Sequence, residues 1–279
     1  MGHRLQVTRL SAGLTQQMLC QKANLSYSTL AKIERGAIKS PSIFTIQSIA
    51  DALGVSLDEL IGASKAHIKQ KKHSKTGISF VYFDVNGCLV HFFQGAFTKL
   101  SEVTGLPVDV VETVYWHYND QVCRGEMKIE DFNKELAKRL KVKSVSWHEF
   151  YFDAVKPIEG VSELVGWVNS NYRVGLLTNT MPGFLDELVR RGLVPDISYD
   201  CIVDSSKVHA IKPEAKMYKL AQEMAGCEPG EILLVDDSRA NLMAAEKSGW
   251  RVSWFDDYNS AESIAKIRQS LEIDDTHPR

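Results

Sequence analysis

The sequence predicts a small all-α domain followed by a larger α/β domain that has a parallel sheet, helices on both of its faces and a small helical cap. Three observations support this prediction. The first sixty residues repeat apolar side chains at helical spacing, a basic polar segment follows, and from residue 78 short apolar runs alternate with helical stretches. With 279 residues, 44% hydrophobic and 24% charged, the chain is long enough for two globular domains.

The overall composition excludes several classes of protein. A net charge of -2 means that any nucleic-acid surface must be local. Five cysteines, an odd number with no Cys-x-x-Cys pair, argue against a disulfide framework or a thiolate zinc site, and we expect reduced thiols in a cytoplasmic protein. The first thirty residues lack the apolar core of a signal peptide, and no run approaches the roughly 18 to 20 apolar residues that span a bilayer, so we expect no membrane partner.

The first domain, residues 1–62, is predicted to be a bundle of five short helices. After a first helix, the hydroxyl of Thr15 can cap a second helix that runs to residue 23. A third helix over residues 27–35 and a fourth over residues 42–53 are each followed by a glycine, which commonly ends helices. A fifth helix begins within residues 55–60.

This segment resembles the phage repressor/Cro-type helix-turn-helix family. The resemblance covers residues 4–62 and rests on Leu14-Thr15-Gln16-Gln17, Leu30-Ala31-Lys32-Ile33-Glu34-Arg35-Gly36, Pro41-Ser42 and Ala52-Leu53-Gly54-Val55-Ser56-Leu57-Asp58-Glu59-Leu60. It implies that the second helix of the pair enters the major groove of double-stranded DNA, and that two half-sites are bound by a homodimer.

The same resemblance implies which side chains contact DNA. Tyr27, Ser28, Thr29 and Lys32 would face the groove, and Gln16 would lie next to a phosphate at a helix end. The alternative is a helical interaction module without DNA binding, in which Tyr27 packs in the core and Lys32 is an ordinary solvated charge.

Residues 63–77 are predicted to form an exposed linker. They contain five lysines, two histidines and no acid, and they have few large apolar side chains with which to build a core. The lysines could add phosphate contacts that weaken with salt, or they could be the ordinary charges of a basic linker. Both interpretations remain open.

The second domain, residues 78–258, is predicted to be a parallel sheet joined by right-handed crossovers. Its strand-like runs lie at 78–83, 174–178, 201–203, 231–235 and 251–255. Residues 92–159 interrupt the alternation with helical patterning, and an insertion directly after the first strand is typical of a cap over a site. Residues 259–279 are predicted to form a C-terminal helix and tail.

Four segments of this domain carry chemically useful side chains at or beside predicted strand ends. They are Asp84-Val85-Asn86-Gly87, Gly175-Leu176-Leu177-Thr178-Asn179-Thr180, Ile211-Lys212-Pro213-Glu214 and Leu234-Val235-Asp236-Asp237-Ser238-Arg239-Ala240-Asn241. A carboxylate nucleophile, a hydroxyl, a cation and paired acids are what phosphoryl transfer needs, because that chemistry is mostly positioning and charge stabilisation. Each segment alone also has a structural explanation, such as a helix cap or a surface cation; the four together predict a phosphoryl-transfer site.

That order of segments resembles the haloacid dehalogenase superfamily of hydrolases over about residues 78–258, and it implies a Rossmann-like fold. The Lys-Pro-Glu-x-x-x-Tyr run at 212–218 and the helical cap resemble its sugar-phosphate phosphatase branch. The resemblance implies that Asp84 forms an aspartyl-phosphate and binds Mg²⁺ together with the main-chain carbonyl of Asn86 and the carboxylate of Asp237. Asp236 would support the metal as a neighbour, and oxygen ligands of this kind suit Mg²⁺.

The resemblance also implies a phosphate site for a small phosphorylated metabolite. Thr178 and Asn179 would hold phosphoryl oxygens, and Lys212 would balance the charge between nucleophile and phosphate. Thr178 and Lys212 would thus act with Asp84 in catalysis. Aromatic residues in the predicted cap, Trp116 and Trp147 among them, could line a pocket, but such side chains are more often core residues and no role is assigned to them.

Asn86 departs from the family pattern, in which a second aspartate usually stands two residues after the nucleophile. An amide can neither protonate a leaving oxygen nor accept a proton from water. Losing general acid-base help typically slows turnover by about 10² to 10⁴. Three interpretations follow: a weakened phosphatase fused to a DNA-binding domain, a phosphometabolite sensor or dimerisation module of a repressor, or a scaffold that has lost both activities.

Overall fold

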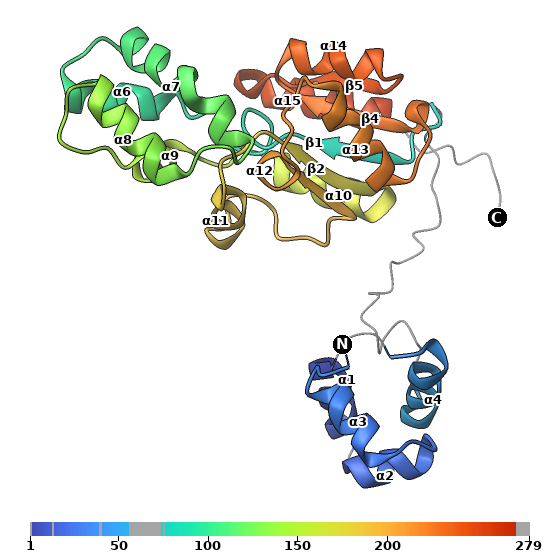
Figure 1. Ribbon diagram of the computed structural model, residues 1–279. Helices are drawn as coiled ribbons and strands as arrows, with labels where there is room; N and C mark the ends of the chain where they lie inside the picture. Colours follow the sequence, from blue (N-terminus) through green and yellow to red (C-terminus); the bar gives the residue numbers. More distant parts are fainter. Residues whose placement is uncertain (1, 13, 39–40, 56–73, 75, 272–279) are drawn as a thin grey trace. The chain divides into compact units, whose positions relative to one another are not determined.

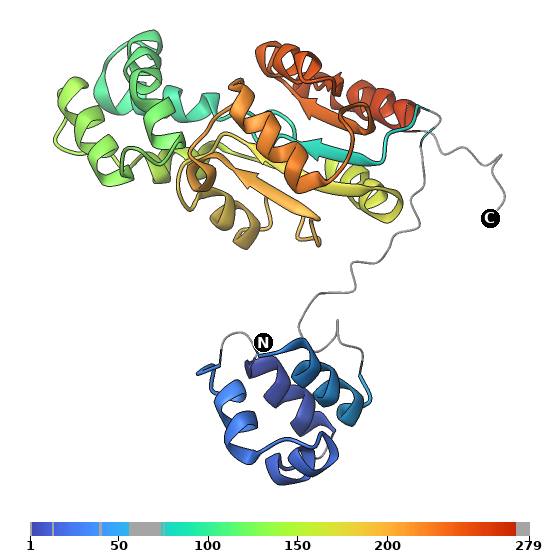
Figure 2. The same ribbon diagram turned by 45° about the vertical axis from the view of Figure 1, so that its right-hand side comes forward.

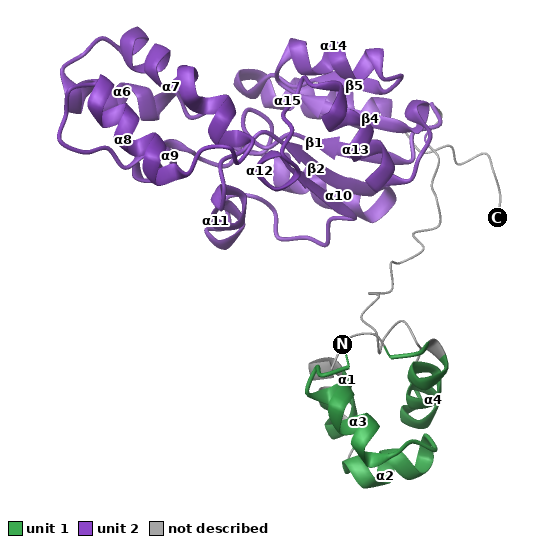
Figure 3. Ribbon diagram, in the orientation of Figure 1, with its two compact units in different colours: residues 1–70 green, residues 71–279 purple. Residues whose placement is uncertain are grey.

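The computed structural model describes residues 2–12, 14–38, 41–55, 74 and 76–271 (Figure 1). The chain divides into two compact units, an N-terminal unit of residues 1–70 and a C-terminal unit of residues 71–279 (Figure 3). The predicted fifth helix at 55–60, most of the predicted linker at 63–77 and the end of the predicted tail lie outside the described residues.

The N-terminal unit confirms the helices predicted before residue 55. The side-chain oxygens of Thr15, Ser26 and Ser42 each accept a main-chain N–H bond as helix caps, and Gly54 has the left-handed φ of 69° that suits a helix end. Each capping residue directly precedes one helix, so the caps explain where these helices begin. The helices are α1 (Gly2–Ser11), α2 (Gln16–Lys22), α3 (Tyr27–Glu34) and α4 (Ile43–Leu53).

The core of this unit is small and aliphatic. It is built from side chains that recur at helical spacing, among them Leu5, Leu19, Leu30, Ile33 and Ile49, all almost fully buried. Burial of these residues from α1 to α4 explains why helices this short are stable, since isolated helices of such length are marginal in water.

The C-terminal unit contains a parallel sheet of five strands, as predicted, and the strand order is β3-β2-β1-β4-β5. The strands are β1 (Phe80–Phe83), β2 (Arg173–Thr178), β3 (Cys201–Asp204), β4 (Ile232–Asp236) and β5 (Arg251–Trp254). β1 lies in the centre and pairs with β2 on one side and β4 on the other. Its four residues are all buried, which explains the continuous apolar run in the sequence.

Helices cover both faces of this sheet, which confirms the Rossmann-like α/β prediction (Figure 2). Val81 and Phe83 pack on one face, and Phe80 and Tyr82 pack on the other. The first face is covered by α10 (Val161–Asn171), α11 (Phe184–Arg190) and α15 (Ser260–Ser270), and the second by α13 (Ala215–Ala225) and α14 (Arg239–Lys247). A short helix, α12 (Ser205–Val208), follows β3.

The insertion after β1 is the predicted helical cap, formed by α6 (Gln94–Thr104), α7 (Val108–Cys123), α8 (Ile129–Arg139) and α9 (Trp147–Ala154). It lies beyond the carboxyl ends of the strands (Figure 2). Aromatic rings fill its interior: Trp147 packs against Phe97 and Tyr115 at centroid distances of 5.4 and 4.4 Å. Within the described residues, no helix combines the length and the apolar character that crossing a bilayer requires.

Candidate active site and DNA-binding surface

The candidate active site lies at the carboxyl ends of three adjacent strands. Asp84 directly follows β1, Asp236 ends β4 and is followed by Asp237, and Thr178 ends β2. Because β2, β1 and β4 are neighbours in the sheet, residues far apart in the sequence meet at one edge. One side-chain oxygen each of Asp84, Asp236 and Asp237 lies within 4.8 Å of the others.

Lys212 joins these acids from the loop before α13. Its Nζ lies 3.0 Å from Asp84 Oδ1 and 2.6 Å from Asp236 Oδ2, and its side chain is completely buried. Burial alone would lower the pKa of the ammonium group, but the charges of Asp236 and Asp84 outweigh burial and raise that pKa. Lys212 is therefore charged and fixed in place.

The acids carry more negative charge than Lys212 can neutralise. Burial, opposed by Lys212 and reinforced by the charge of Asp236, raises the pKa of Asp84 to about 6. Burial together with the charges of Asp84 and Asp236 raises the pKa of Asp237 to about 7. Three carboxylates around one ammonium group leave a surplus of negative charge, which favours binding of a cation.

The side chain of Asp236 is already occupied by hydrogen bonds. Besides Lys212, it accepts from the main-chain N–H of Ser238 at 2.9 Å and from Asn241 Nδ2 at 3.0 and 3.2 Å. Asp236 is thus placed to support its neighbours. Sequence reasoning gave Asn241 no role, although it stands in the same segment, as the third residue of α14.

The loop after β1 is shaped around Asp237. Gly87 has a φ of +80°, and a Cβ atom on it would lie 2.3 Å from Asp237 Oδ2. Only glycine permits both this conformation and this close approach. The main-chain carbonyl of Asn86, in the same loop, accepts no hydrogen bond from the residues that the structure describes, so it is available as a ligand.

Thr178 and Asn179 differ in what their side chains can offer. Thr178 is fully buried, and its Oγ1 has no hydrogen-bond partner among the described residues, which is costly unless a ligand completes it. The amide of Asn179 binds the main chain of Lys212: Nδ2 donates to the carbonyl of Lys212 at 2.8 Å, and Oδ1 accepts its N–H at 2.8 Å. The Asn179 side chain therefore holds the Lys212 loop. It also lines the cavity, and because Nδ2 carries a second N–H, its contact with a phosphoryl oxygen stays a prediction.

Tyr151 is a site residue that sequence reasoning missed. Its hydroxyl donates a 2.6 Å hydrogen bond to Asn86 Oδ1 and so links the cap helix α9 to the loop after the nucleophile. The two residues are 65 positions apart, and nothing in the local sequence signals the contact. Because the carbonyl end of the Asn86 amide faces Tyr151, the Asn86 side chain is held by the cap.

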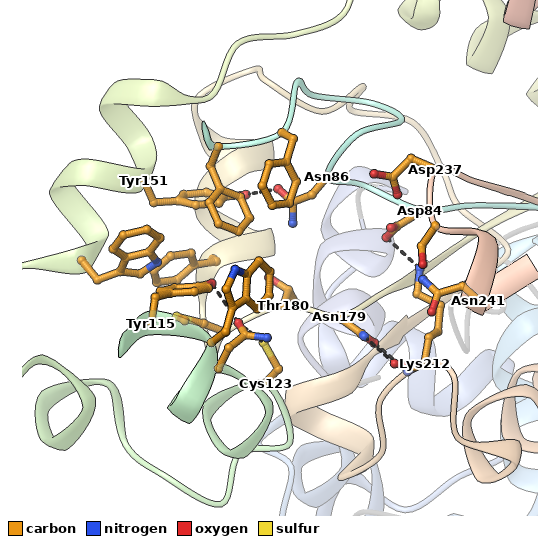
Figure 4. Close-up of a pocket in the computed structure, with 18 residues that line it drawn as sticks. Asp84, Asn86, Tyr115, Cys123, Tyr151, Asn179, Thr180, Lys212, Asp237 and Asn241 are labelled. Atoms are coloured by element: carbon orange, nitrogen blue, oxygen red, sulfur yellow. Dashed lines mark hydrogen bonds and ion pairs between the residues drawn. The ribbon is translucent and has the colours of Figure 1, made fainter. Parts of the chain in front are cut away.

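One cavity of about 180 Å³ is lined by Asp84, Asn86, Tyr151, Asn179, Lys212, Asp237 and Asn241, whereas Thr178 and Asp236 are not among its lining residues (Figure 4). Asp84, Lys212 and Asp237 lie at one side, and Tyr115 and Tyr151 lie on the cap side. The exposed Trp116 and the buried Trp147 line the cavity as well. For Trp147 the core interpretation is confirmed, but it also contributes to the pocket. The complete aromatic lining is Phe92, Phe93, Tyr115, Trp116, Trp147, Tyr151 and Phe184.

In the N-terminal unit, the side chains of α3 expected to contact DNA stand at both ends of that helix: Tyr27, Ser28 and Thr29 at its start, and Lys32 in its last turn. Tyr27, Ser28 and Lys32 are exposed, and Thr29 is partly buried. The hydroxyls of Ser28 and Thr29 lie 3.0 and 2.8 Å from Ser26 Oγ, which caps the same helix. The helix start is therefore polar and carries an exposed tyrosine, and an exposed lysine follows in the last turn.

Gln16 stands at the first position of α2, and its side chain belongs to a buried network. Gln16 Nε2 donates to Glu34 Oε2 at 2.7 Å, and Arg9 donates to both oxygens of Glu34 at 2.7 and 3.1 Å. Arg9 also donates to the carbonyl of Leu14. Burial raises the pKa of Glu34, but the bonds from Arg9 and Gln16 outweigh burial and lower it. Sequence reasoning did not find this network.

Two family models match the chain. A helix-turn-helix model matches residues 5–60, and a haloacid dehalogenase-like hydrolase model matches residues 78–249, more than half of the chain. The immunity repressor protein of Bacillus phage phi105 is 43% identical over 61 residues; the match covers 22% of this chain and 42% of the repressor. The pyrophosphatase PpaX of Bacillus velezensis is 25% identical over 181 residues, covering 56% of this chain and 82% of PpaX.

Solved structures share the fold of the C-terminal unit. A predicted HAD-like hydrolase from Porphyromonas gingivalis has a TM-score of 0.58 at 21% identity, covering 68% of this chain and 97% of that one. The enzyme bt-2542 from Bacteroides thetaiotaomicron, as an Asp-to-Ala mutant complexed with magnesium and inorganic phosphate, has a TM-score of 0.53 at 18% identity, covering 64% and 94%. The chain therefore belongs to the haloacid dehalogenase-like hydrolase family and carries a helix-turn-helix DNA-binding domain at its N-terminal side.

Proposed function

We propose that the C-terminal unit is a Mg²⁺-dependent phosphohydrolase that works through an aspartyl-phosphate on Asp84, and that the protein as a whole is a cytoplasmic transcription regulator. The observation that carries the enzymatic part is the meeting of Asp84, Lys212 and Asp237 at one end of a cavity. The substrate would be a small phosphorylated metabolite. PpaX, by its name, hydrolyses pyrophosphate, which is also phosphoryl chemistry.

The reaction begins with the carboxylate of Asp84. Its Oδ1 is held by Lys212 at 3.0 Å and by the N–H of Val85 at 2.7 Å, which fixes the plane of the carboxylate. An oxygen of Asp84 attacks the phosphorus, the bond to the leaving oxygen breaks, and its electron pair goes to that oxygen. Lys212 offsets the charge where nucleophile and phosphoryl group meet, and Thr178 Oγ1 donates to a phosphoryl oxygen. Water then releases inorganic phosphate from Asp84.

The residues present fit Mg²⁺. The carboxylates of Asp84 and Asp237 and the free carbonyl of Asn86 are hard oxygen donors, and Gly87 leaves the space in which Asp237 stands. Asp236 would support them through Lys212 and Asn241. When bound, Mg²⁺ supplies positive charge to the phosphoryl oxygens. The surplus negative charge of the acid cluster gives the site its preference for a cation.

Asn86 limits the rate of this chemistry. Neither its amide nor Tyr151, whose pKa burial raises well above the ordinary value of a phenol, can act as a general base at neutral pH. The leaving oxygen and the attacking water must then exchange protons with solvent. We expect both steps to be slower by about 10² to 10⁴ than with a carboxylic acid at this position. The second candidate function, a weak or inactive domain that senses a phosphometabolite or assists dimerisation, is favoured by the same residue.

The N-terminal unit would bind specific double-stranded DNA as a homodimer. We propose that α3 enters the major groove, with Tyr27, Ser28, Thr29 and Lys32 toward the bases. The Gln16 side chain, through its bond to Glu34, fixes α2 relative to α3, so its contact with a phosphate would come from the helix start. Lys32→Ala should weaken binding to a symmetric operator, whereas Lys22→Ala, at the far end of α2, should matter less.

The enzymatic proposal is tested by intact mass after incubation with acetyl phosphate and Mg²⁺. The wild-type protein should gain the mass of one phosphoryl group and keep it for longer than Asn86→Asp does, because the aspartate restores a base for hydrolysis. Asp84→Asn should gain none. The phosphohydrolase proposal would be contradicted if the wild-type protein gained no mass and neither it nor the Asn86→Asp variant released phosphate. The sensor function would then be the remaining candidate.

A further inference from the structure

Aromatic side chains predominate on the cap side of the cavity, beside Asn119 and Cys123 of α7. Tyr115 and Trp116 reach it from α7, and Trp147 and Tyr151 reach it from α9. Figure 4 shows Tyr115 and Tyr151 on the side opposite Asp84 and Lys212. A phosphoryl group at the acids would therefore direct the organic part of its ester toward ring faces. Such surfaces favour flat apolar groups.

The charge of the lining restricts the ligand further. Among the described residues that line the cavity, Lys212 is the one cation, and its ammonium group is already paired with Asp84 and Asp236. A second phosphate or carboxylate on the ligand would be desolvated against the aromatic wall without a partner, which is costly. The cavity therefore suits a ligand with a single anionic group.

The size of the cavity limits the organic group. An engineered apolar cavity of about 150 Å³ is enough to hold benzene. The 180 Å³ here include the end at which the phosphoryl group would lie. One six-membered ring and a phosphoryl group fit this space, whereas a second ring would extend beyond it.

We propose that the substrate is a phosphate monoester of a single uncharged aromatic ring. This inference rests on the proposed phosphohydrolase and names its substrate class. Trp116 is then a specificity-determining residue, because its exposed ring supplies stacking surface at the cavity.

The test is binding of non-hydrolysable phosphonates to the full chain with Mg²⁺, measured by isothermal titration calorimetry. Benzylphosphonate should bind about tenfold more tightly than ethylphosphonate, because ring stacking adds affinity. Phosphonoacetate, with its second charge, should bind most weakly. Equal affinity for the benzyl and ethyl ligands, or tighter binding of phosphonoacetate, would overturn the inference.

Two variants test the ring surface. Trp116→Ala should remove most of the preference for the benzyl ligand, whereas Tyr258→Ala, at an aromatic side chain that is 92% exposed and outside the cavity, should keep it. A Trp116→Ala variant that keeps the full preference would contradict the role of Trp116.

Failure of this inference can be told apart from failure of the proposed function. If acetyl phosphate labels Asp84 but the phosphonates show no ring preference, the phosphohydrolase stands and the substrate class is wrong. If benzylphosphonate is preferred but Asp84 is never labelled, the cavity binds the proposed ligand class without turning it over, and the sensor function follows.

Discussion

Each unit of the protein buries a cluster of ionised side chains, and the two clusters differ in charge balance. In the N-terminal unit, one guanidinium group meets one carboxylate: Arg9 donates to both oxygens of Glu34, and Gln16 adds a neutral donor. In the C-terminal unit, the single ammonium group of Lys212 meets the carboxylates of Asp84 and Asp236, and Asp237 lies beside them.

The comparison teaches how a structural ion pair differs from a site. A balanced pair with satisfied donors holds α1, α2 and α3 together and has no further need of a ligand. An unbalanced cluster that is nearly buried keeps two carboxyl pKa values high and is completed only by an added cation. Both clusters contain buried acids. They differ in whether the buried positive charges are enough to balance those acids.

The largest effect is expected from removing the one cation of the acid cluster. Lys212→Met leaves Asp84 and Asp236 buried without a counter-charge, and the free energy of unfolding of the C-terminal unit should fall by about 3 to 5 kcal/mol. All five tryptophans lie in this unit, so urea unfolding followed by tryptophan fluorescence reports on it alone. The control is Lys266→Met, which breaks the exposed pair with Glu262 and should leave the urea midpoint nearly unchanged. An equal loss of stability in Lys212→Met and Lys266→Met would contradict the claim that Lys212 balances buried charges.

The next effect concerns the balanced pair. Glu34→Gln leaves Arg9 buried beside a neutral amide and should destabilise the N-terminal unit by about 3 kcal/mol. Amide hydrogen exchange of α2 and α3 in the full chain, followed by mass spectrometry, should show faster exchange. Tryptophan fluorescence unfolding of the other unit should stay unchanged; a loss of protection in both units would mean that the two networks are not independent.

A smaller effect, a gain in stability instead of a loss, is expected from a change at Asp237. Asp237→Asn removes surplus negative charge, so in EDTA the C-terminal unit should become more stable by about 1 kcal/mol, at the expense of function. The measurement is again urea unfolding. If neutralising Asp237 destabilises the metal-free protein as Glu34→Gln does, the acid cluster is an ordinary structural network.

The two clusters should also respond to pH in opposite directions. The pKa of Glu34 is lowered in the folded state, so its stabilisation is present above the unfolded pKa and is lost as pH falls through the folded value. Burial and neighbouring charges raise the pKa of Asp84 to about 6 and that of Asp237 to about 7, so their contribution is greatest at low pH and is lost as pH rises through these values. Metal-free protein melted at a series of pH values should show both trends, and Glu34→Gln and Asp237→Asn should each flatten one.

Much of the fold could be predicted because burial leaves a local pattern. The strands β1 and β4 are buried on both faces, and residues 80–83 and 232–235 read as unbroken apolar runs. Capping residues such as Ser42 mark helix starts for the same local reason. The position of Asp84 followed because a polar residue at the tip of an apolar strand is uncommon. Lys212 lies in the loop before α13, and its place beside Asp84 followed from the family resemblance.

The contacts that could not be predicted depend on side-chain direction between distant segments. Tyr151 reaches Asn86 from a cap helix, and Arg9 reaches Glu34 across a gap of 25 residues, with no periodic signal at either end. For Asn179 the position at the site was found, but not that its amide faces the main chain of Lys212.

The most direct test of the acid cluster is thermal unfolding with and without Mg²⁺, followed by tryptophan fluorescence. Saturating Mg²⁺ at about 100 times its Kd should add about 2.7 kcal/mol to the stability of the C-terminal unit, and Asp237→Asn should lose this gain. A wild-type protein whose melting is unchanged by Mg²⁺, or a variant that gains as much as the wild-type protein does, would contradict the claim that these carboxylates form a metal site.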